Sequence, residues 1–405
     1  MHSVFNSLGS NYDQHFISKS RQLLFSPWTW RSFKSAQELE SLLKKQFAAD
    51  TVYLTYKGRH AITLALQHLG IKQGDQVITQ AFTCWAVEEG IRNSGAKPVF
   101  ADTDSHSLNL SISTLIAAHK KAPEAKAVLI QHTLGFPAPI KAIKAFCQKN
   151  HLFLIEDLAH AYGTNDLGGV PLGTYADAVI LSFGRDKIID AISGGALILK
   201  HQPASEPIIR NTPTSRIIID LLYPPTTSLI RRTHQAFIGK LIHRLLKKTP
   251  ILTNPIQSTT FGITSLPAPH AQLALDSIAN LQSQLEHRRQ ITKVYLEQLE
   301  ISTFSTSTQA APLRLPLLVP QRAALISHLK TYHFHIPDTW YKKPVETGSL
   351  THTLSLYPKG SCPNAEKLSA RIINLPTHIN VSPAQAGKLA LLVNQYVAKH
   401  QTNHR

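Results

Sequence analysis

Residues 178–199 read AVILSFGRDKIIDAISGGALIL, and residues 152–163 read LFLIEDLAHAYG. Each stretch starts with a short, continuously apolar run, and the longer one also ends with such a run. Runs of this kind, alternating with helices, are typical of a mostly parallel sheet that is buried on both faces. Because ligands of such sheets bind beyond the carboxyl ends of the strands, the residues after these runs are candidates for chemistry.

Similar strand and helix units extend in both directions from this region. Strands are predicted at 52–55, 76–79, 98–100, 127–131, 152–155, 178–182 and 196–199, and helices at 35–47, 61–69, 85–93 and 139–150. The regularity ends near residue 201. Beyond it, we predict one long helix at 267–299, a strand at 313–319, and helices at 321–331 and 383–399. The expected fold class is α/β: a three-layer large domain on a mostly parallel sheet, with a smaller C-terminal α+β domain.

Three regions are expected along the chain. Residues 1–20 are polar and are predicted to form a poorly anchored N-terminal arm. The large domain is expected at 21–258, with a basic amphipathic insert at about 205–255, and the long helix and small domain at 259–405. No run of about 18 apolar residues appears, so no membrane-spanning helix is expected. The N-terminus also lacks the pattern of a secretory signal.

The composition favours a folded protein of a reducing cytoplasm. Of the 405 residues, 43% are hydrophobic and 17% are charged, which excludes disorder for most of the length. Cys84, Cys147 and Cys362 are too few and too far apart for a disulfide framework or a zinc pattern. The histidines show no metal-ligand spacing, so no metal site is expected. The formal net charge is +17, but no nucleic-acid-binding motif accompanies it, and nucleic acid is not an expected partner.

Two candidate catalytic side chains follow apolar runs that suit neighbouring strands. Asp157 comes directly after the run at 152–155, and Lys187 lies five residues beyond the run at 178–182. An acid and a lysine at such strand ends suit a cofactor with a basic ring nitrogen and an aldehyde, which are features of pyridoxal phosphate. The lysine amine would make the Schiff base, and the carboxylate would keep the ring nitrogen protonated.

A phosphate cradle is also predicted. Gly58 and Arg59 lie between a strand and the helix that starts near residue 61. Gly58 lets the backbone approach a ligand closely, and free N–H groups at a helix N-terminus bind phosphate. The hydroxyl of Ser182, at the end of a strand, would add another donor.

Seven stretches, in order along the chain, resemble the motifs of one known family. They are KGRHAITLAL, GDQVITQAFTCWAV, GAKPVFADTDSHSLNL, IQHTLGFPAPI, IEDLAHAYG, SFGRDKIIDAISGG and CPNAEKLSARIINLPTH. The likeness runs from about residue 53 to residue 199 and returns in the C-terminal segment. Seven ordered matches are far more specific than any single one. The chain therefore resembles the DegT/StrS family of pyridoxal-phosphate-dependent sugar aminotransferases, which have the transferase fold of type I.

The resemblance implies an enzyme that moves an amino group from glutamate or glutamine to a nucleotide-linked keto sugar by a ping-pong mechanism, in polysaccharide biosynthesis. It assigns Lys187 as the Schiff-base and proton-shuttle lysine, and Asp157 as the partner of the pyridinium nitrogen. His160 would lie beside the cofactor's ring oxygen. Ser182 and the backbone at 58–59 would bind the phosphate. The resemblance also implies a cytoplasmic homodimer with active sites at the interface.

The chain departs from the family pattern at three places. The position of the aromatic residue that usually stacks on the cofactor ring is Cys84, with Trp85 next to it, so either residue is a candidate to cover the ring. The stretch FGITSLPAPHAQLAL, before the long helix, lacks the Asn that reaches the partner subunit's phosphate site in many members. Arg59 replaces a small hydroxyl residue, and its guanidinium suits bidentate phosphate binding.

Ordinary structural roles stand beside these assignments. Asp157 also suits a helix cap, Ser182 a turn, and Lys187 a surface lysine. His160 also suits a hydrogen-bonded structural residue, and Trp85 a plain core residue.

Two other classes of function stay open. A fold-type-I enzyme acting on an amino acid would need an arginine for the α-carboxylate, for which Arg314 and Arg371 are candidates. A non-catalytic regulatory or membrane-surface homologue would keep the fold without the cofactor.

The stretch SLIRRTHQAFIGKLIHRLLKK at 228–248 is basic and amphipathic. On one helix, its apolar residues would share a broad face, while Arg232, Lys240, Arg244 and Lys247 gather opposite. One interpretation is a solvated helix packed on the large domain or at a dimer interface. The sharper hypothesis is an interfacial helix that makes peripheral contact with an anionic membrane.

Overall fold

The structure is a computed structural model that describes residues 3–202, 206–235, 237–247, 249–252, 262–304, 310–336, 340–347 and 355–401. Its centre is a seven-stranded sheet with the spatial order β2-β8-β7-β6-β5-β3-β4. β8 runs antiparallel to both of its neighbours, and the other pairs are parallel. The strands are β2 Thr51–Thr55, β3 Gln76–Gln80, β4 Lys97–Ala101, β5 Ala127–Gln131, β6 Phe153–Asp157, β7 Ala178–Ser182 and β8 Gly195–Leu199. The mostly parallel sheet agrees with the prediction.

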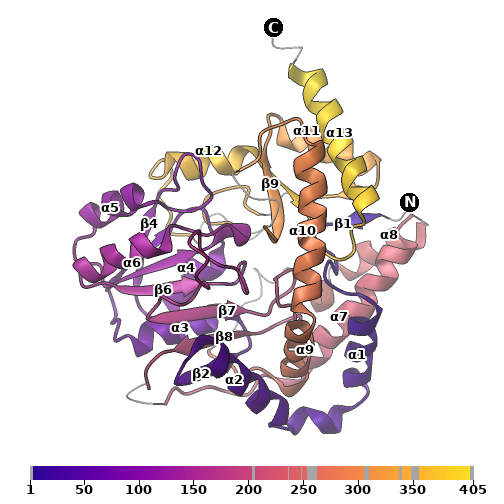
Figure 1. The fold of residues 1–405 in the computed structure, drawn as a ribbon. Coiled ribbons are helices and arrows are strands. Elements are labelled where there is room, and N and C mark those ends of the chain that lie inside the picture. Colours follow the sequence, from indigo (N-terminus) through magenta and orange to yellow (C-terminus); the bar gives the residue numbers. More distant parts are fainter. Residues whose placement is uncertain are drawn as a thin grey trace.

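Both faces of this sheet are buried, which gives the expected three layers (Figure 1). Successive residues of one strand belong to different hydrophobic clusters, as Val128 and Leu129 of β5 show. Because side chains alternate across a strand, an all-apolar run needs apolar partners on both sides. The helices are α1 Gln14–Leu24, α2 Lys34–Phe47, α3 Gly58–His68, α4 Trp85–Asn93, α5 Ile112–Lys121, α6 Ile140–Lys149, α7 Thr214–Thr233, α8 Phe237–Leu246, α9 Ala268–Ala279, α10 Leu281–Gln298, α11 Arg322–Thr331, α12 Pro363–Arg371 and α13 Pro383–Gln401.

A smaller α+β part surrounds its own hydrophobic cluster. β9 (Arg314–Leu318) pairs antiparallel with β11 (Ile372–Pro376), and α10, α11 and α13 pack around this pair. β10 (Phe334–His335) pairs in parallel with β1 (Val4–Phe5). The first strand of the chain therefore completes the C-terminal part.

The prediction of a poorly anchored N-terminal arm is wrong. Ser10, Asn11 and Tyr12 are buried, and Val4 belongs to the hydrophobic cluster of the small part. Polar side chains in this segment find partners inside the fold, so their polarity did not signal exposure.

Two helices predicted as single elements are divided. The helix expected at 267–299 breaks at Asn280, whose φ of −92° and ψ of 5° end α9 before α10 begins. The stretch at 228–248 is split near His234 between the end of α7 and α8. Of the expected basic insert at 205–255, residues 205, 236, 248 and 253–255 lie outside the described residues.

Candidate active site

A cavity of about 1370 Å³ lies beyond the carboxyl ends of β6 and β7. Six of the eight residues predicted for the site line it: Gly58, Arg59, Cys84, Asp157, Ser182 and Lys187. Trp85 is absent from the lining, and His160 lies beneath it, in contact with Lys187. The position agrees with the rule that open α/β sheets bind ligands at this edge.

Asp157 is the last residue of β6 and is buried. Burial raises the pKa of its carboxyl group, while a hydrogen bond from the Ala159 N–H (2.9 Å) and the nearby charge of Lys187 oppose that shift. The other oxygen, Oδ2, accepts no hydrogen bond from the described residues. A buried carboxylate with a free oxygen can hold a cationic N–H group of a ligand. The neighbouring Glu156 instead accepts from Gly173 N–H and contacts His132, which is a structural role.

Lys187 and His160 form the closest polar pair in the cavity floor. The Lys187 Nζ lies 2.7 Å from His160 Nε2, and the Leu134 N–H donates to His160 Nδ1 at 3.1 Å. The acceptor role of Nδ1 places the ring proton on Nε2 in the neutral imidazole. Burial lowers the pKa of Lys187 and lowers the pKa of His160 well below its ordinary value. In this tautomer the imidazole N–H faces the amine and can donate to it when the amine is uncharged, which is the form that attacks a carbonyl.

The predicted phosphate turn is built by close backbone packing. Gly58 begins α3, and no side chain caps this helix at Lys57. A Cβ atom at Gly195 of β8 would lie 2.8 Å from the Cα and N atoms of Gly58, so only glycine lets the strand pass this turn. Ser182 lines the same part of the cavity.

Lys57 is a cavity residue that the sequence reasoning missed. Its Nζ donates to Ser193 Oγ at 3.1 Å, and burial lowers its pKa to about 8. The place of Lys57 in the sequence, directly before the predicted phosphate turn, is a signal from which this second amine could have been identified.

The guanidinium of Arg59 forms a buried ion pair with Glu89 of α4. This pairing commits at least part of the guanidinium to a carboxylate of the protein. Bidentate phosphate binding by the Arg59 side chain stays a prediction.

The aromatic cover of the site comes from Trp340, which the sequence reasoning did not identify. Its ring stacks on His160 with centroids 4.8 Å apart, and Lys187 Nζ lies 4.5 Å from the ring. Trp85 turns instead toward the guanidinium of Arg92, at 5.3 Å. Trp340 belongs to the C-terminal part of the chain, where no strand-end pattern pointed to it.

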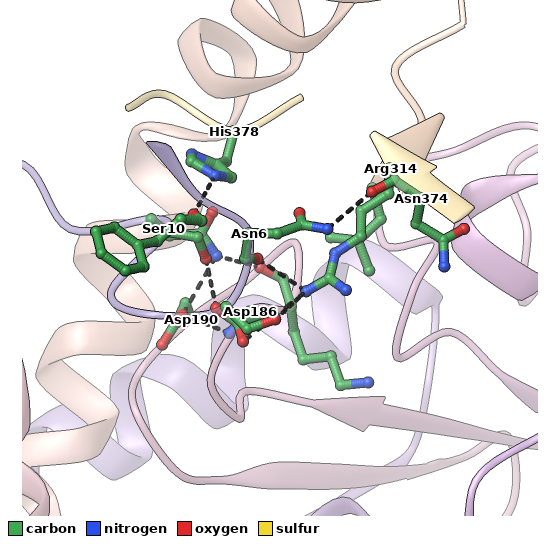
Figure 2. Close-up of polar contacts among 12 residues, drawn as sticks. Asn6, Ser10, Asp186, Asp190, Arg314, Asn374 and His378 are labelled. Carbon is green, nitrogen blue, oxygen red and sulfur yellow. Dashed lines mark hydrogen bonds and ion pairs between the residues drawn. The ribbon is translucent and has the colours of Figure 1, made fainter. Parts of the chain in front are cut away.

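The N-terminal segment holds the loop that carries Lys187 (Figure 2). Asn11 Nδ2 donates to the Lys187 carbonyl oxygen at 2.8 Å, and the Tyr12 hydroxyl donates to Asp190 at 3.0 Å. Ser10 donates to Asp186 from the same segment. The side chains of three consecutive residues thus fix the loop between β7 and β8.

Arg314 ties this segment to the small part of the protein. It donates to the Asn6 carbonyl oxygen at 3.0 Å and to Ser7 Oγ at 2.9 Å, and it lies 3.9 Å from Asp186. Neither Arg314 nor Arg371 is among the residues that line the cavity. Arg371 is exposed, whereas Arg314 is buried and its guanidinium lies 4.0 Å from the ring of Trp340, which also contacts Lys187.

Comparisons with known proteins agree with this architecture. The family model of the DegT/DnrJ/EryC1/StrS aminotransferase family matches residues 11–215 and 243–393. The GDP-perosamine synthase of Escherichia coli O157:H7 is 32% identical over 172 residues, which are 42% of this chain and 46% of that protein. The GDP-perosamine synthase of Vibrio cholerae is 37% identical over 141 residues, 35% of this chain and 38% of that protein. These matches span less than half the length of either relative.

The likeness of fold extends over the whole chain. The crystal structure of S. venezuelae DesV in complex with a ketimine intermediate has a TM-score of 0.74 and 20% sequence identity, and the match covers 98% of both chains. The ordered motifs, the sheet and the two long stretches matched by the family model lead to one assignment. This chain belongs to the DegT/DnrJ/EryC1/StrS aminotransferase family.

Proposed function

We propose that this protein is a pyridoxal-phosphate-dependent aminotransferase that moves an amino group from glutamate or glutamine to a keto sugar. We expect the sugar to be linked to a diphosphate, as in the GDP-linked sugar that appears in the names of two relatives. The observation that carries the proposal is the pairing of Lys187 and Asp157 in one cavity beside a glycine-built turn.

The residues of the cavity fit pyridoxal phosphate. Asp157 offers a free carboxylate oxygen for a ring N–H, and Lys187 offers an amine whose pKa burial lowers. The turn at Gly58 is packed closely against Gly195, and no side chain caps the N–H groups at the start of α3. Ser182 supplies a hydroxyl there. These groups match an aromatic cation, an aldehyde and a phosphate.

When bound, the cofactor supplies an aldehyde for the lysine amine and a ring that accepts an electron pair. Asp157 holds the proton on the ring nitrogen, because its carboxylate charge favours the cationic ring. Lys187 Nζ moves a proton to and from the substrate carbon as general base and acid. His160 Nε2–H orients the free amine between these transfers. Trp340 covers the amine and excludes water from it.

Borohydride reduction followed by peptide mapping tests the assignment. The protein as purified with pyridoxal phosphate should carry the reduced label on Lys187, and Lys187→Arg should carry none. Lys57→Arg is a matched control, because Lys57 is a second cavity amine with a lowered pKa. A label on Lys57 in the unaltered protein would contradict the assignment. A protein that binds no cofactor would support the non-catalytic alternative instead.

Arg371 is exposed and does not support the alternative of an amino acid substrate, while Arg314, which lies 4.0 Å from the ring of Trp340, keeps that alternative open. Two further parts of the proposal concern assembly and location. We expect a homodimer in the cytoplasm, with peripheral membrane contact through 228–248. Within the described part of the chain, no helix has the length and apolar character that crossing a membrane requires. Light scattering of the purified protein measures the dimer directly.

A further inference from the structure

The end of α7 and the start of α8 lie outside the part of the chain that the family model matches, which skips residues 216–242. Between residues 221 and 275 the sequence contains no Asp or Glu. α7 packs against α1 and α8 packs against α7, and Figure 1 shows them on the side of the molecule opposite α5 and α6. This region is therefore basic and contains no acidic side chain of its own to balance its charge.

The basic side chains of α8 line the active-site cavity and are at the same time exposed to solvent. Eight side chains from α7, α8, α11 and the residues after them line the cavity, and we call them the entrance cluster: His234, Lys240, His243, Arg244, Lys247, Lys330, His333 and His335. The carboxylates in the lining are Asp157 and Asp186, which belong to the region of Lys187. Lys240, Arg244, Lys247 and Lys330 form no ion pair with any described residue.

The histidines of the entrance cluster are crowded and incompletely bonded. His234 is only 7% exposed, and its Nδ1 has no hydrogen-bond partner among the described residues. Its ring centroid lies 4.6 Å from that of His335, whose Nε2 is also unpartnered. Burial, together with the charges of His234 and Lys330, lowers the pKa of His335 to about 4. Buried ring nitrogens without a partner in the described part of the chain, beside lysine and arginine side chains that form no ion pair there, suit a ligand that is anionic and forms hydrogen bonds.

The opposite face of α8 is apolar and exposed. Ile238, Leu241 and Leu245 follow the spacing of one helix face and are 60%, 44% and 63% exposed. We call these three residues the outer stripe. A surface helix normally buries this face and exposes its charges. Both faces of α8 are exposed, so the apolar outer stripe lies directly beside a cationic entrance.

We propose that the outer stripe inserts into the surface of an anionic membrane, and that the entrance cluster binds the diphosphate of a sugar acceptor carried on a membrane lipid. The inference rests on the proposed aminotransferase function and specifies its carrier. Apolar residues beside basic ones suit the boundary between lipid headgroups and acyl chains. The cations that face inward then receive the anionic headgroup of a lipid whose sugar reaches Lys187.

Vesicle co-sedimentation of the pyridoxal-phosphate-loaded full chain tests the outer stripe. The protein should pellet with vesicles that contain phosphatidylglycerol and stay in solution with phosphatidylcholine alone. Leu241→Gln/Leu245→Gln should weaken this binding about tenfold or more. Ile116→Gln/Leu167→Gln removes two other exposed apolar side chains, 36% and 86% exposed, and should leave it unchanged.

Vesicles of phosphatidylcholine doped with polyprenyl diphosphate test the entrance cluster. They should retain the protein, and Lys240→Gln/Arg244→Gln should release it. Lys120→Gln/Lys121→Gln on α5 removes the same amount of charge from an exposed site, and this variant should stay bound to the vesicles. Inorganic pyrophosphate should compete with the doped vesicles.

Three outcomes would overturn the inference. In the first, the protein binds none of the vesicles but binds a soluble nucleoside diphosphate, and that binding is lost in Lys240→Gln/Arg244→Gln. Another is a dimer that Leu241→Gln/Leu245→Gln turns into a monomer, because a second copy would then cover the outer stripe. In the third, Leu241→Gln/Leu245→Gln binds the phosphatidylglycerol vesicles as tightly as the unaltered protein does. Borohydride labelling of Lys187 in the outer-stripe variant separates these results from a failure of the proposed function, since the label depends on the cofactor and not on the membrane.

Discussion

Gly195→Ala is the substitution whose effect follows most directly from the geometry of the phosphate turn. A Cβ at this position would lie 2.8 Å from the Cα and N atoms of Gly58 and 2.8 Å from the Leu181 carbonyl oxygen. Ordinary contact begins at 3.4 Å, so three backbone atoms must each give way by about 0.6 Å. Backbone cannot rotate aside as a side chain can, and β8 must move away from the start of α3.

The displacement should cost both stability and phosphate affinity. Overpacking of this kind lowers the free energy of unfolding by about 1–3 kcal/mol. The N–H groups at the start of α3 shift relative to Ser182, and the loss of one charge-assisted hydrogen bond of about 1.5–3 kcal/mol weakens phosphate binding by roughly 10–100-fold. Denaturant unfolding measures the first effect. Equilibrium titration with pyridoxal phosphate measures the second, and titration with pyridoxal, which lacks the phosphate, isolates the turn.

Gly168→Ala is the control, because its Cβ would meet only Asp166 at 3.4 Å and its φ is not positive. This variant should match the unaltered protein in both measurements. The reasoning is refuted if Gly195→Ala keeps the unaltered stability and affinity, since the backbone contact would then impose no constraint. An equal loss of affinity for pyridoxal and pyridoxal phosphate would refute the assignment of the turn to phosphate.

Three further predictions concern the amine and its cover. In the cofactor-free protein, Lys187 should capture pyridoxal phosphate faster as the pH rises, with a midpoint below that of an exposed lysine. The reason is that burial lowers its pKa and only the free amine reacts. A midpoint at or above that of an exposed lysine would contradict this. Asn11→Ala removes the hydrogen bond to the Lys187 carbonyl oxygen. It should lower the free energy of unfolding by about 1–3 kcal/mol and speed amide hydrogen exchange at 184–190. Unchanged exchange would show that the N-terminal segment does not hold the loop. Trp340→Ala should shorten the retention of cofactor during dialysis while Trp85→Ala leaves it unchanged; the reverse order would return the stacking role to Trp85.

The sheet was predictable because its physical cause is local in the sequence. A strand buried on both faces must be apolar at every position, and β5, β7 and β8 were each recognised within one residue. The residues that end β6 and β7 were found for the same reason. Strand ends of a parallel sheet share one edge, so a pattern read along the chain becomes proximity in space.

The parts that were missed depend on contacts between distant segments. Asn11 and Lys187 are 176 positions apart, and the polar N-terminal segment gives no sign of its buried partners. Trp340 reaches His160 from the small part of the protein. The amphipathic pattern of α8 was recognised, but its place beside the active-site cavity was not, because periodicity defines two faces without stating which elements they meet.

The reactivity of Lys187 illustrates why those distant contacts matter for chemistry. Its motif places a lysine after a strand, yet an exposed lysine there would be protonated and unable to attack a carbonyl. Burial lowers its pKa. The ring of Trp340 lies 4.5 Å from the amine, and Asn11 binds the backbone carbonyl oxygen of the same lysine. Both ends of the chain therefore contact a lysine near its middle, and we expect them to contribute to its burial. A truncation that removes residues 1–12 should thus raise the pKa of Lys187 even where the sheet stays folded, which the pH dependence of aldehyde capture measures. An unchanged midpoint in the truncated protein would mean that the sheet and Trp340 alone provide the burial.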